Sequence, residues 1–401
     1  MNILFLTMSR MTDINDRGIY PDLMREFIKE GHNLYIVAPS ERRFNEKTHM
    51  INWDRCTLLR VRVGNLQKTN LMEKGVSTLL IESQFKVAIK KYFPNVKFDL
   101  VLYSTPPITF VNVIKYVKKR DGARTYLLLK DIFPQNAVDL NMFSKKSPIY
   151  MYFRLKEKNL YKISDYIGCM SQANVDYVIK HNSYVDKDIV HISPNSIDIL
   201  DVSRDDVNRD EVRRRFGIPQ DDTVFIYGGN LGKPQGIPFL IECIMANENK
   251  NGRYFVISGT GTEYNKLKTY FDENKPKNML LINGLPKNEY EELVSVCDVG
   301  LIFLDHRFTI PNFPSRLLGY IQCSMPVIAC TDVNTDVGRV IEDGNFGWWC
   351  ESNSTIEFTK AVERALEADL DKLGKNGFEY LKNNYTVKHS CEIICSKVGI
   401  K

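Results

Sequence analysis

A glycine-rich turn at residues 228–236 combines the residue types with which proteins hold a diphosphate. An apolar strand-like run ends at Tyr227, the turn reads Gly-Gly-Asn-Leu-Gly-Lys-Pro-Gln-Gly, and a helix-like stretch follows. Glycines let the backbone approach a ligand, a helix start presents free N–H groups, and Lys233 adds a full positive charge. Pro-Ser-Arg at 314–316 opens another predicted helix in the same half. Each of the two motifs alone is more often an ordinary loop without a ligand, but together they predict a nucleotide-sugar site.

The segments around these turns alternate between strand-like and helix-like patterns. Alternation of this kind predicts α/β domains, each with a parallel sheet covered by helices on both faces, and a ligand at the carboxyl ends of the strands. The predicted strands are 2–7, 33–38, 100–103, 125–129, 223–227, 253–258, 279–282, 299–303 and 326–329, and the predicted helices of the first half are 20–30, 78–92 and 110–119.

The length of 401 residues fits two domains. The charge-dense stretch from Asp201 to Asp222 predicts an interdomain connection with a short helix, and the boundary lies near residues 193–203. We therefore expect an N-terminal acceptor-binding domain at 1–195 and a C-terminal nucleotide-sugar-binding domain at 196–385. The last segment, 386–401, is expected to be a helix that returns to the N-terminal domain.

The positive charge of the chain is concentrated in its first half. Residues 1–200 hold 30 Lys or Arg against 20 Asp or Glu, whereas residues 201–401 hold 24 against 29. Residues 144–162 carry six Lys or Arg, one acid and several aromatic residues, a pattern that fits either a membrane surface or a core-packing helix with a solvated basic face. Because no nucleic-acid motif is visible, the charge favours the inner face of the cell membrane over nucleic acid as partner.

The cysteines and histidines predict no metal site. The nine cysteines are scattered without a Cys-x-x-Cys pair, which indicates a reduced, cytoplasmic protein, and the six histidines form no cluster with zinc-ligand spacing. The apolar start of the chain lacks a basic leader and is expected to be a buried strand. No run is long and apolar enough to span a membrane, so any membrane contact is expected to be peripheral.

Five motifs together resemble the nucleotide-sugar glycosyltransferases with two Rossmann-like domains, called GT-B, and among them glycosyltransferase family 4. The resemblance covers nearly the whole chain and is closest to a subgroup from bacterial O-antigen and capsule synthesis, whose Ser-Pro-Pro loop and Asp-Leu-Trp-Pro-Glu segment are similar to residues 104–107 and 131–135. The five motifs are Gly-Asn-Leu-Gly-Lys-Pro-Gln-Gly at 229–236, Gly-Thr-Gly-Thr-Glu at 259–263, Pro-Asn-Ser-Ile-Asp at 194–198, Pro-Ser-Arg at 314–316 and Pro-Val-Ile-Ala at 326–329.

This resemblance implies two domains that face a central cleft and a transferase that moves an N-acetylated sugar from a UDP-sugar to a lipid-linked saccharide with retention. Neither a metal nor a further cofactor is expected, because basic groups and helix N-termini can neutralise the diphosphate. A UDP-sugar epimerase of the same fold and a non-catalytic glycosyltransferase-like partner are the alternatives. The second alternative is motivated by Pro311 and Gly319, which occupy positions where many family 4 enzymes have glutamates that contact the donor.

Three residues are the candidates for chemistry. Lys233 and Arg316 are expected to stabilise the leaving diphosphate, although Lys233 could be a solvated loop lysine and Arg316 could pair with a carboxylate. Asp131 is expected to accept the proton of the acceptor hydroxyl or to orient that hydroxyl, and the alternative is a helix cap before Pro134.

The remaining candidates are expected to bind the donor. Gly18 lies in a loop that resembles the family's glycine-bearing loop next to the diphosphate, or else is an ordinary turn glycine. Asp305 and His306 are weaker candidates for contact with the donor sugar. The full set of predicted donor-binding residues is Gly18, Gly229, Asn230, Leu231, Gly232, Gly259, Gly261, Glu263, Pro314 and Ser315.

Overall fold

The computed structural model describes residues 1–66, 69, 71–200 and 207–399. The strands are β1 (Asn2–Leu6), β2 (Asn33–Glu41), β3 (His49–Trp53), β4 (Cys56–Val63), β5 (Leu100–Ser104), β6 (Arg124–Leu129), β7 (Tyr166–Cys169), β8 (Val190–Ile192), β9 (Thr223–Asn230), β10 (Arg253–Thr260), β11 (Met279–Ile282), β12 (Val299–Phe303), β13 (Val327–Thr331) and β14 (Gly347–Glu351).

The α-helices are α1 (Ile19–Lys29), α2 (Leu71–Tyr92), α3 (Val111–Asp121), α4 (Gln135–Asp139), α5 (Pro148–Ile163), α6 (Gln172–His181), α7 (Arg209–Phe216), α8 (Ile237–Met245), α9 (Tyr264–Asn274), α10 (Lys287–Ser295), α11 (Arg316–Gln322), α12 (Val337–Asp343), α13 (Thr355–Glu367), α14 (Leu370–Asn384) and α15 (Val387–Lys397). Short 3-10 helices are η1 (Arg42–Phe44), η2 (Lys187–Ile189) and η4 (Lys233–Gln235). Among the described helices, none is both long and apolar enough to cross a bilayer.

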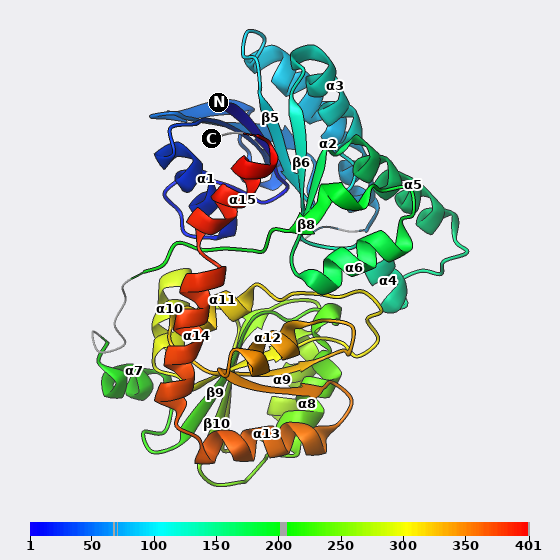
Figure 1. Ribbon diagram of the computed structural model, residues 1–401. Helices are drawn as coiled ribbons and strands as arrows, with labels where there is room; N and C mark the ends of the chain where they lie inside the picture. The colour runs from blue at the N-terminus through cyan, green and yellow to red at the C-terminus, as the bar shows by residue number, and fades with distance from the viewer. Residues whose placement is uncertain (67–68, 70, 201–206, 400–401) are drawn as a thin grey trace. The chain divides into compact units, whose positions relative to one another are not determined.

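The chain divides into two compact units, which Figure 1 shows with their elements labelled. Unit 1 comprises Met1–Asp198 and Val387–Lys401, and unit 2 comprises Ile199–Thr386. The predicted connection from Asp201 to Asp222 contains the short helix α7, but its residues 201–206 lie outside the described residues, as do the last two residues of the predicted C-terminal segment.

The sheet of unit 1 has, among the described residues, eight strands in the order β3-β4-β2-β1-β5-β6-β7-β8. Only β3 in this order runs antiparallel to its neighbour. Helix α15 packs against α1 (Figure 1), and its residues Cys391 and Ile394 are buried with Met24 and Phe27 in the core of this unit. The end of the chain therefore contributes to the core of the N-terminal sheet.

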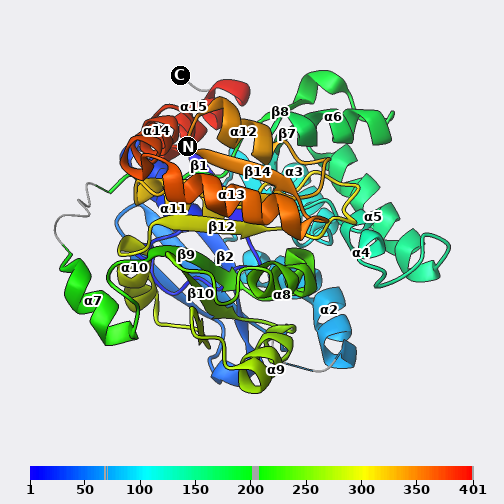
Figure 2. The same cartoon turned by 90° about the horizontal axis from the view of Figure 1, so that it is seen from below.

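The sheet of unit 2 is entirely parallel over its described strands, in the order β11-β10-β9-β12-β13-β14. Strand β9 lies between β10 and β12. The chain adds β10 and β11 on one side of β9, and then β12, β13 and β14 on the other side. Helices α8, α9 and α13 line one face of this sheet, where α8 packs against both of the others (Figure 2). A ligand is expected at the carboxyl end of β9, because loops diverge where the strand order reverses.

The prediction of two α/β domains with parallel sheets is confirmed. The predicted strands 279–282 and 299–303 coincide with β11 and β12, and β9 and β10 extend further than predicted. The strands missed were β3, β4, β7, β8 and β14. These strands are either short or mix apolar with charged residues, so that burial in the sheet, rather than local pattern, decides their structure.

Candidate functional site

Strand β9 carries two glycines, Gly228 and Gly229, near its carboxyl end. Gly229 adopts a φ of +113°, a conformation that residues with a side chain rarely adopt. A Cβ atom on Gly228 would overlap the ring of Tyr290 in α10. The strand continues to Asn230, beyond its predicted end at Tyr227, so the glycines form the carboxyl end of the strand itself. Tyr290 fills the space beside Gly228, whereas Gly229 is exposed, so a ligand can approach the main chain closely at Gly229.

The Gly-x-Gly turn after β10 packs directly on this first turn. The N–H of Glu263 donates to the carbonyl oxygen of Leu231 at 2.9 Å. A Cβ atom on Gly259 would overlap the carbonyl oxygen of Gly229, and one on Gly261 would overlap that of Leu231. The two predicted turns are thus one structural unit, and the glycines of the second turn allow the close approach.

This close approach makes a testable prediction about Gly259. We expect Gly259→Ala to destabilise unit 2 by about 1–3 kcal/mol, because backbone atoms rather than a flexible side chain occupy the space. Gly319→Ala is the control: nothing lies within 4 Å of a Cβ there, and alanine should stabilise α11 by about 0.5–1 kcal/mol. Thermal and denaturant unfolding of both variants measures the difference, and equal midpoints would contradict the packing described here.

Arg316 lies against the first turn and has a buried nitrogen with no hydrogen-bond partner. Its guanidinium stacks 4.3 Å from the ring centroid of Tyr227. Its Nη2 lies 3.7 Å from the position of a Cβ on Gly229, and its Nη1 is the buried, unpaired atom. Among the described residues no carboxylate pairs with it, and its neighbours are instead tyrosines, of which Tyr227 lies closest to the guanidinium. A buried guanidinium N–H without an acceptor marks a position for a ligand anion.

Lys233 begins the 3-10 helix η4, which precedes α8. Its side chain is exposed and has no ion pair in the part of the chain that the structure describes, as both interpretations of this lysine allow. The turn around it is fixed by Gln235, whose Oε1 accepts from Nδ2 of Asn230 at 3.0 Å and from the N–H of Gly232 at 3.2 Å. The structure therefore holds Lys233 at a fixed turn next to the glycines while its ammonium group stays available.

The other predicted donor-site residues in unit 2 have structural partners. Pro314 and Ser315 precede α11, and the N–H of Leu317 donates to the carbonyl of Pro314 at 3.2 Å. Glu263 is buried at the start of α9, where its carboxylate pairs with Lys266.

Asp131 is held in unit 1 just after strand β6. The amide nitrogen of Asn136 donates to both of its carboxylate oxygens, at 2.8 and 2.9 Å. The hydroxyl oxygen of Thr105 accepts from the backbone N–H of Asp131 at 3.0 Å. Burial raises the pKa of the Asp131 carboxyl to about 6, and the Asn136 hydrogen bonds offset part of this effect. The N-cap residue of α4 is Pro134, so the alternative of an Asp131 helix cap is not what the structure shows.

Lys130, which sequence reasoning missed, precedes this carboxylate. Its Nζ donates to the carbonyl oxygen of Ser193 at 3.3 Å, and burial lowers its pKa to about 7. In the sequence the residue has no signal beyond its place after a buried strand. Lys130 is half-buried, at the end of β6 next to β7.

Gly18 is the N-cap of α1 and adopts a φ of 151°. Its N–H donates to Oδ1 of Asp22 at 2.9 Å, and the N–H of Asp22 donates back to its carbonyl at the same distance. Residues with a side chain rarely adopt this conformation, and a place for Gly18 next to the diphosphate stays a prediction. Gly18 and Asp131 belong to unit 1, whereas the other candidates belong to unit 2.

Two aspartates end neighbouring strands in unit 2. Asp305 follows β12, donates its N–H to the carbonyl of Pro234 at 3.0 Å and pairs with Arg307, while His306 is exposed. Asp332, which sequence reasoning missed, follows β13, and its buried Oδ2 has no partner in the described part of the chain. Burial raises the pKa of Asp332 to about 6. The sequence signal that could have identified Asp332 is its position directly after a buried strand. An unpaired carboxylate oxygen at this position can accept a hydrogen bond from a hydroxyl group of a ligand.

Across residues 1–66, 69, 71–200 and 207–399, no three His, Cys, Asp or Glu side chains gather in a way that could hold a metal ion. Two positively charged side chains, Arg316 and Lys233, lie near the carboxyl end of β9. Such groups, with backbone N–H groups, can bind a phosphate ester directly.

Similarity to known proteins agrees with this arrangement. Residues 208–380 match the family model described as Glycosyl transferases group 1. The chain is 23% identical over 327 residues to the probable glycosyltransferase WbjE of Pseudomonas aeruginosa. This alignment covers 81% of the chain and 80% of WbjE.

Solved structures share the fold at low sequence identity. Sucrose-phosphate synthase from Thermosynechococcus elongatus superposes with a TM-score of 0.77 at 15% identity, over 99% of this chain and 98% of that one. HepE of Anabaena, in complex with UDP and glucose, gives a TM-score of 0.71 at 13% identity over 99% of both chains. Residues 208–380 thus form a glycosyl transferases group 1 domain, and the protein is a glycosyltransferase with the GT-B fold.

Proposed function

We propose that the protein transfers an N-acetylated sugar from a UDP-sugar to a lipid-linked saccharide, with retention of configuration, in the synthesis of a bacterial capsule or O-antigen. The observation that carries the donor part is the buried, unpaired Nη1 of Arg316 beside the bare backbone of Gly229. The sugar, the acceptor and the retention follow from the family 4 resemblance of the motifs, especially residues 104–107 and 131–135.

The donor diphosphate fits the edge of the β9 sheet. Arg316 supplies two N–H donors next to the glycine turn, and Lys233 supplies a second positive charge. HepE, which has the same fold, was solved in complex with UDP and glucose, and this supports a nucleoside diphosphate as a ligand of a protein with this fold. Asp332 offers a carboxylate oxygen to a sugar hydroxyl, in a domain where Pro311 and Gly319 supply none.

The chemistry then needs charge stabilisation and a proton acceptor. The bond between the anomeric carbon and the diphosphate oxygen breaks, and the acceptor oxygen forms the new glycosidic bond. Arg316 and Lys233 stabilise the charge that develops on the leaving UDP. Asp131, with a pKa raised to about 6 by burial, takes the proton of the acceptor hydroxyl.

A peripheral membrane contact is proposed for α5 and the segment before it. The exposed face of this region mixes large apolar side chains with lysines, and its buried face carries Glu157, Leu160 and Tyr161. The exposed apolar residues are Met142, Ile149, Met151, Tyr152 and Leu155. A helix that only packed on the core would leave polar residues outside, so this face favours the inner leaflet of the cell membrane over the solvated alternative.

We expect Lys145, Lys146, Lys156 and Lys158 to hold the protein on anionic lipid. Replacing all four with alanine should weaken binding to phosphatidylglycerol vesicles by about 100-fold or more, since each lysine near an anionic surface contributes about 1 kcal/mol. The matched control replaces Lys360, Lys372, Lys375 and Lys382 of unit 2 with alanine. Sedimentation with vesicles at low and high salt measures the effect, and equal binding of both quadruple variants would refute the assignment.

A two-step experiment tests the proposed function. Calorimetry with UDP and with a panel of nucleoside diphosphates establishes the donor nucleotide. A panel of UDP-sugars with bacterial membrane extract, read by mass spectrometry of the lipid fraction, then identifies the product. UDP binding without a glycosylated lipid for any donor would favour the non-catalytic alternative, and absence of UDP binding would refute the donor assignment.

A further inference from the structure

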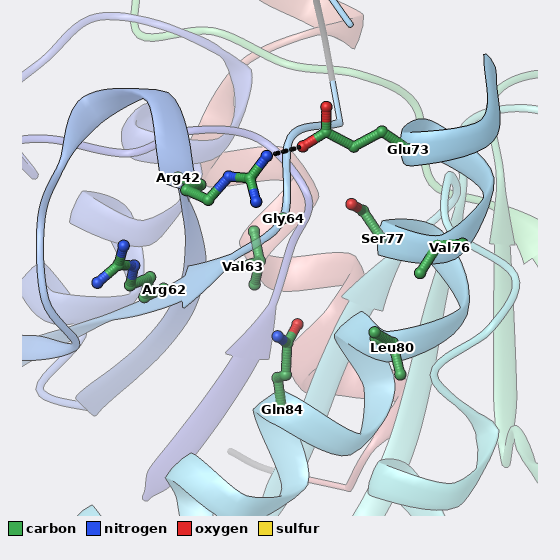
Figure 3. Close-up of a pocket in the computed structure, with 9 residues that line it drawn as sticks. All are labelled: Arg42, Arg62, Val63, Gly64, Glu73, Val76, Ser77, Leu80 and Gln84. Atoms are coloured by element: carbon green, nitrogen blue, oxygen red, sulfur yellow. Dashed lines mark hydrogen bonds and ion pairs between the residues drawn. The ribbon is translucent and has the colours of Figure 1, made fainter. Parts of the chain in front are cut away.

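An open pocket of about 550 Å³ and the end of strand β6 are two places in unit 1 where a buried side-chain oxygen has no partner among the described residues. The pocket lies where η1, the end of β4 and the first half of α2 meet, and its oxygen is Oε1 of Gln84 (Figure 3). There Arg42 already pairs with Glu73 at 2.8 Å, which neutralises both charges. At the end of β6 the oxygen is Oδ1 of Asn136, whose amide group binds Asp131, a carboxylate without an ion pair in the described part of the chain.

The hydroxyl group of Thr105 fixes the backbone of Asp131. Its oxygen accepts from the backbone N–H groups of Lys130 and Asp131, both at 3.0 Å, and it donates to the carbonyl oxygen of Asp131, also at 3.0 Å. Thr105 is buried directly after β5, which is the parallel neighbour of β6. One side chain therefore joins the segments 104–107 and 131–135, which resemble two segments of the O-antigen and capsule subgroup.

Asn136 fixes the side chain of Asp131. Its Nδ2 donates to both carboxylate oxygens, at 2.8 and 2.9 Å, and the backbone N–H of Ile132 also donates to the carboxylate. An ionised carboxylate has about four acceptor positions, so these bonds leave one position for a ligand. Asp131 is only half-buried, so an acceptor molecule can reach the carboxylate.

The orientation of the Asn136 amide leaves its own oxygen without a partner. A buried amide oxygen that receives no hydrogen bond costs free energy. The reversed amide would place this oxygen against the carboxylate and would lose both bonds to Asp131, so the orientation follows from the hydrogen-bond network. An unmet hydrogen bond is thus tolerated at Oδ1 while Nδ2 holds Asp131. Such unmet groups are few in native proteins, and a role at a catalytic site is one of their explanations.

The charged groups around Asp131 leave its carboxylate without a cation. Lys130 directs its Nζ to a backbone carbonyl oxygen at 3.3 Å. Glu157 of α5 interacts electrostatically with Asp131 but pairs with Arg154, and Asp139 of α4 accepts a hydrogen bond within its own helix. A ligand therefore meets a hydrogen-bond acceptor at this carboxylate, and no described cation beside it could bind a phosphate. This chemistry fits a hydroxyl group.

We propose that Asn136 is a positioning residue that keeps Asp131 ionised and aims its remaining acceptor position at a neutral hydroxyl group of a saccharide, with Thr105 holding the backbone. The proposal rests on the proposed transferase function and narrows its acceptor. The attacking group is a sugar hydroxyl of the lipid-linked saccharide, because transfer onto the phosphate of a lipid would bring a second negative charge against the carboxylate.

Titration of the Asp131 carboxyl group tests the positioning role without any acceptor. Carbon NMR of the full-length protein labelled at the aspartate carboxyl groups gives the titration midpoint, and Asp131→Asn identifies the signal. The hydrogen bonds from Asn136 lower the pKa of Asp131, so Asn136→Ala should raise the midpoint above about 6. Asn136→Asp keeps the shape but places a second carboxylate beside the first, so it should raise the midpoint further.

The matched control is Gln172→Ala. Nε2 of Gln172 donates to the Asp176 carboxylate at 2.8 Å on the exposed surface of α6, so this variant also removes an amide-to-carboxylate bond of unit 1. It should leave the titration midpoint of Asp131 unchanged.

Transfer to soluble acceptors tests the acceptor class. With a UDP-sugar donor, we expect kcat/KM for octyl glycosides to be at least about tenfold higher than for octyl phosphate. Asn136→Ala should lower kcat with the glycoside by about tenfold or more, move the rise of kcat to higher pH and leave UDP affinity unchanged. Thr105→Val lacks the hydroxyl group and should also lower kcat, whereas Thr105→Ser keeps the hydroxyl group and should restore most of the rate.

The outcomes separate this inference from the proposed function. Unfolding midpoints and UDP affinity close to those of the wild type show that the variants are folded. The same titration midpoint of Asp131 in the wild type, Asn136→Ala and Asn136→Asp overturns the positioning role, and a preference for octyl phosphate overturns the acceptor class, even if a UDP-sugar is the donor. If the midpoint shifts as expected but no glycoside or membrane lipid receives a sugar, the positioning role stands and the proposed transferase reaction fails.

Discussion

Arg316→Ala should reduce kcat/KM for the sugar donor by about 100- to 1000-fold and weaken UDP binding by a comparable factor. The guanidinium is the group that lies next to Gly229 with a buried, unpaired nitrogen, and loss of a preorganised donor to a developing charge costs about 3–4 kcal/mol. The same change removes the stacking on Tyr227, which is a smaller effect on stability. Steady-state kinetics and UDP calorimetry measure both consequences.

Two comparisons make the result specific to the anion. Arg316→Lys keeps one positive charge but loses the planar fork, so it should recover only part of the UDP affinity. Arg339→Ala removes an exposed arginine of the same unit and should change neither quantity. Wild-type UDP affinity in Arg316→Ala, with the protein folded, would remove the basis for placing the diphosphate at this turn.

Asp131→Asn should lower the transfer rate by about 100-fold or more with little change in donor binding, because general base catalysis contributes about 10²- to 10⁴-fold. In the wild-type protein the acceptor reaction should rise with pH through about 6 and then level off, since the carboxylate must be ionised and burial has raised its pKa from 3.8 to about 6. The rate of the Asp131→Asn variant should not show this rise with pH. The pH dependence of kcat with a lipid acceptor, measured for both proteins, tests the difference.

Stability gives a second, independent readout for Asp131. Because the folded-state pKa lies above the unfolded value, the group favours the folded state most below pH about 4, and this contribution is lost as the pH rises through about 6. Asp131→Asn removes the cost of a buried charge, so at pH 8 its unfolding midpoint should not fall below that of the wild type. If the Asp131→Asn variant is inactive but as stable as the wild type, Asp131 has a role in the reaction. If the variant loses both stability and activity, its role is structural. If the variant keeps the decrease in rate below about pH 6, Asp131 is excluded as the base.

Much of the fold followed from local pattern. The alternation of apolar runs with helical periodicity identified two α/β domains, and the strands that were predicted best, β11 and β12, are short, continuous apolar runs. Strand β4, which carries Arg60 and Arg62 among apolar residues, was missed because its charges are accommodated by neighbours, such as the Arg60–Glu46 pair. Pairing of this kind joins residues that are distant in the sequence, so the periodicity of apolar residues does not predict it.

The sequence by itself determined where backbone must come close to backbone, because only glycine can adopt the φ of Gly229 or allow the contact at Gly259, and residue type records that requirement directly. The tertiary structure alone decided which distant groups meet and which are removed from water. It placed Arg316 on Tyr227, half-buried Lys130, buried Asp332, and left Gln84 unpaired in a pocket built from three separate segments. Desolvation and unmet hydrogen bonds depend on these long-range contacts, so chemistry at such positions becomes visible only in the folded chain.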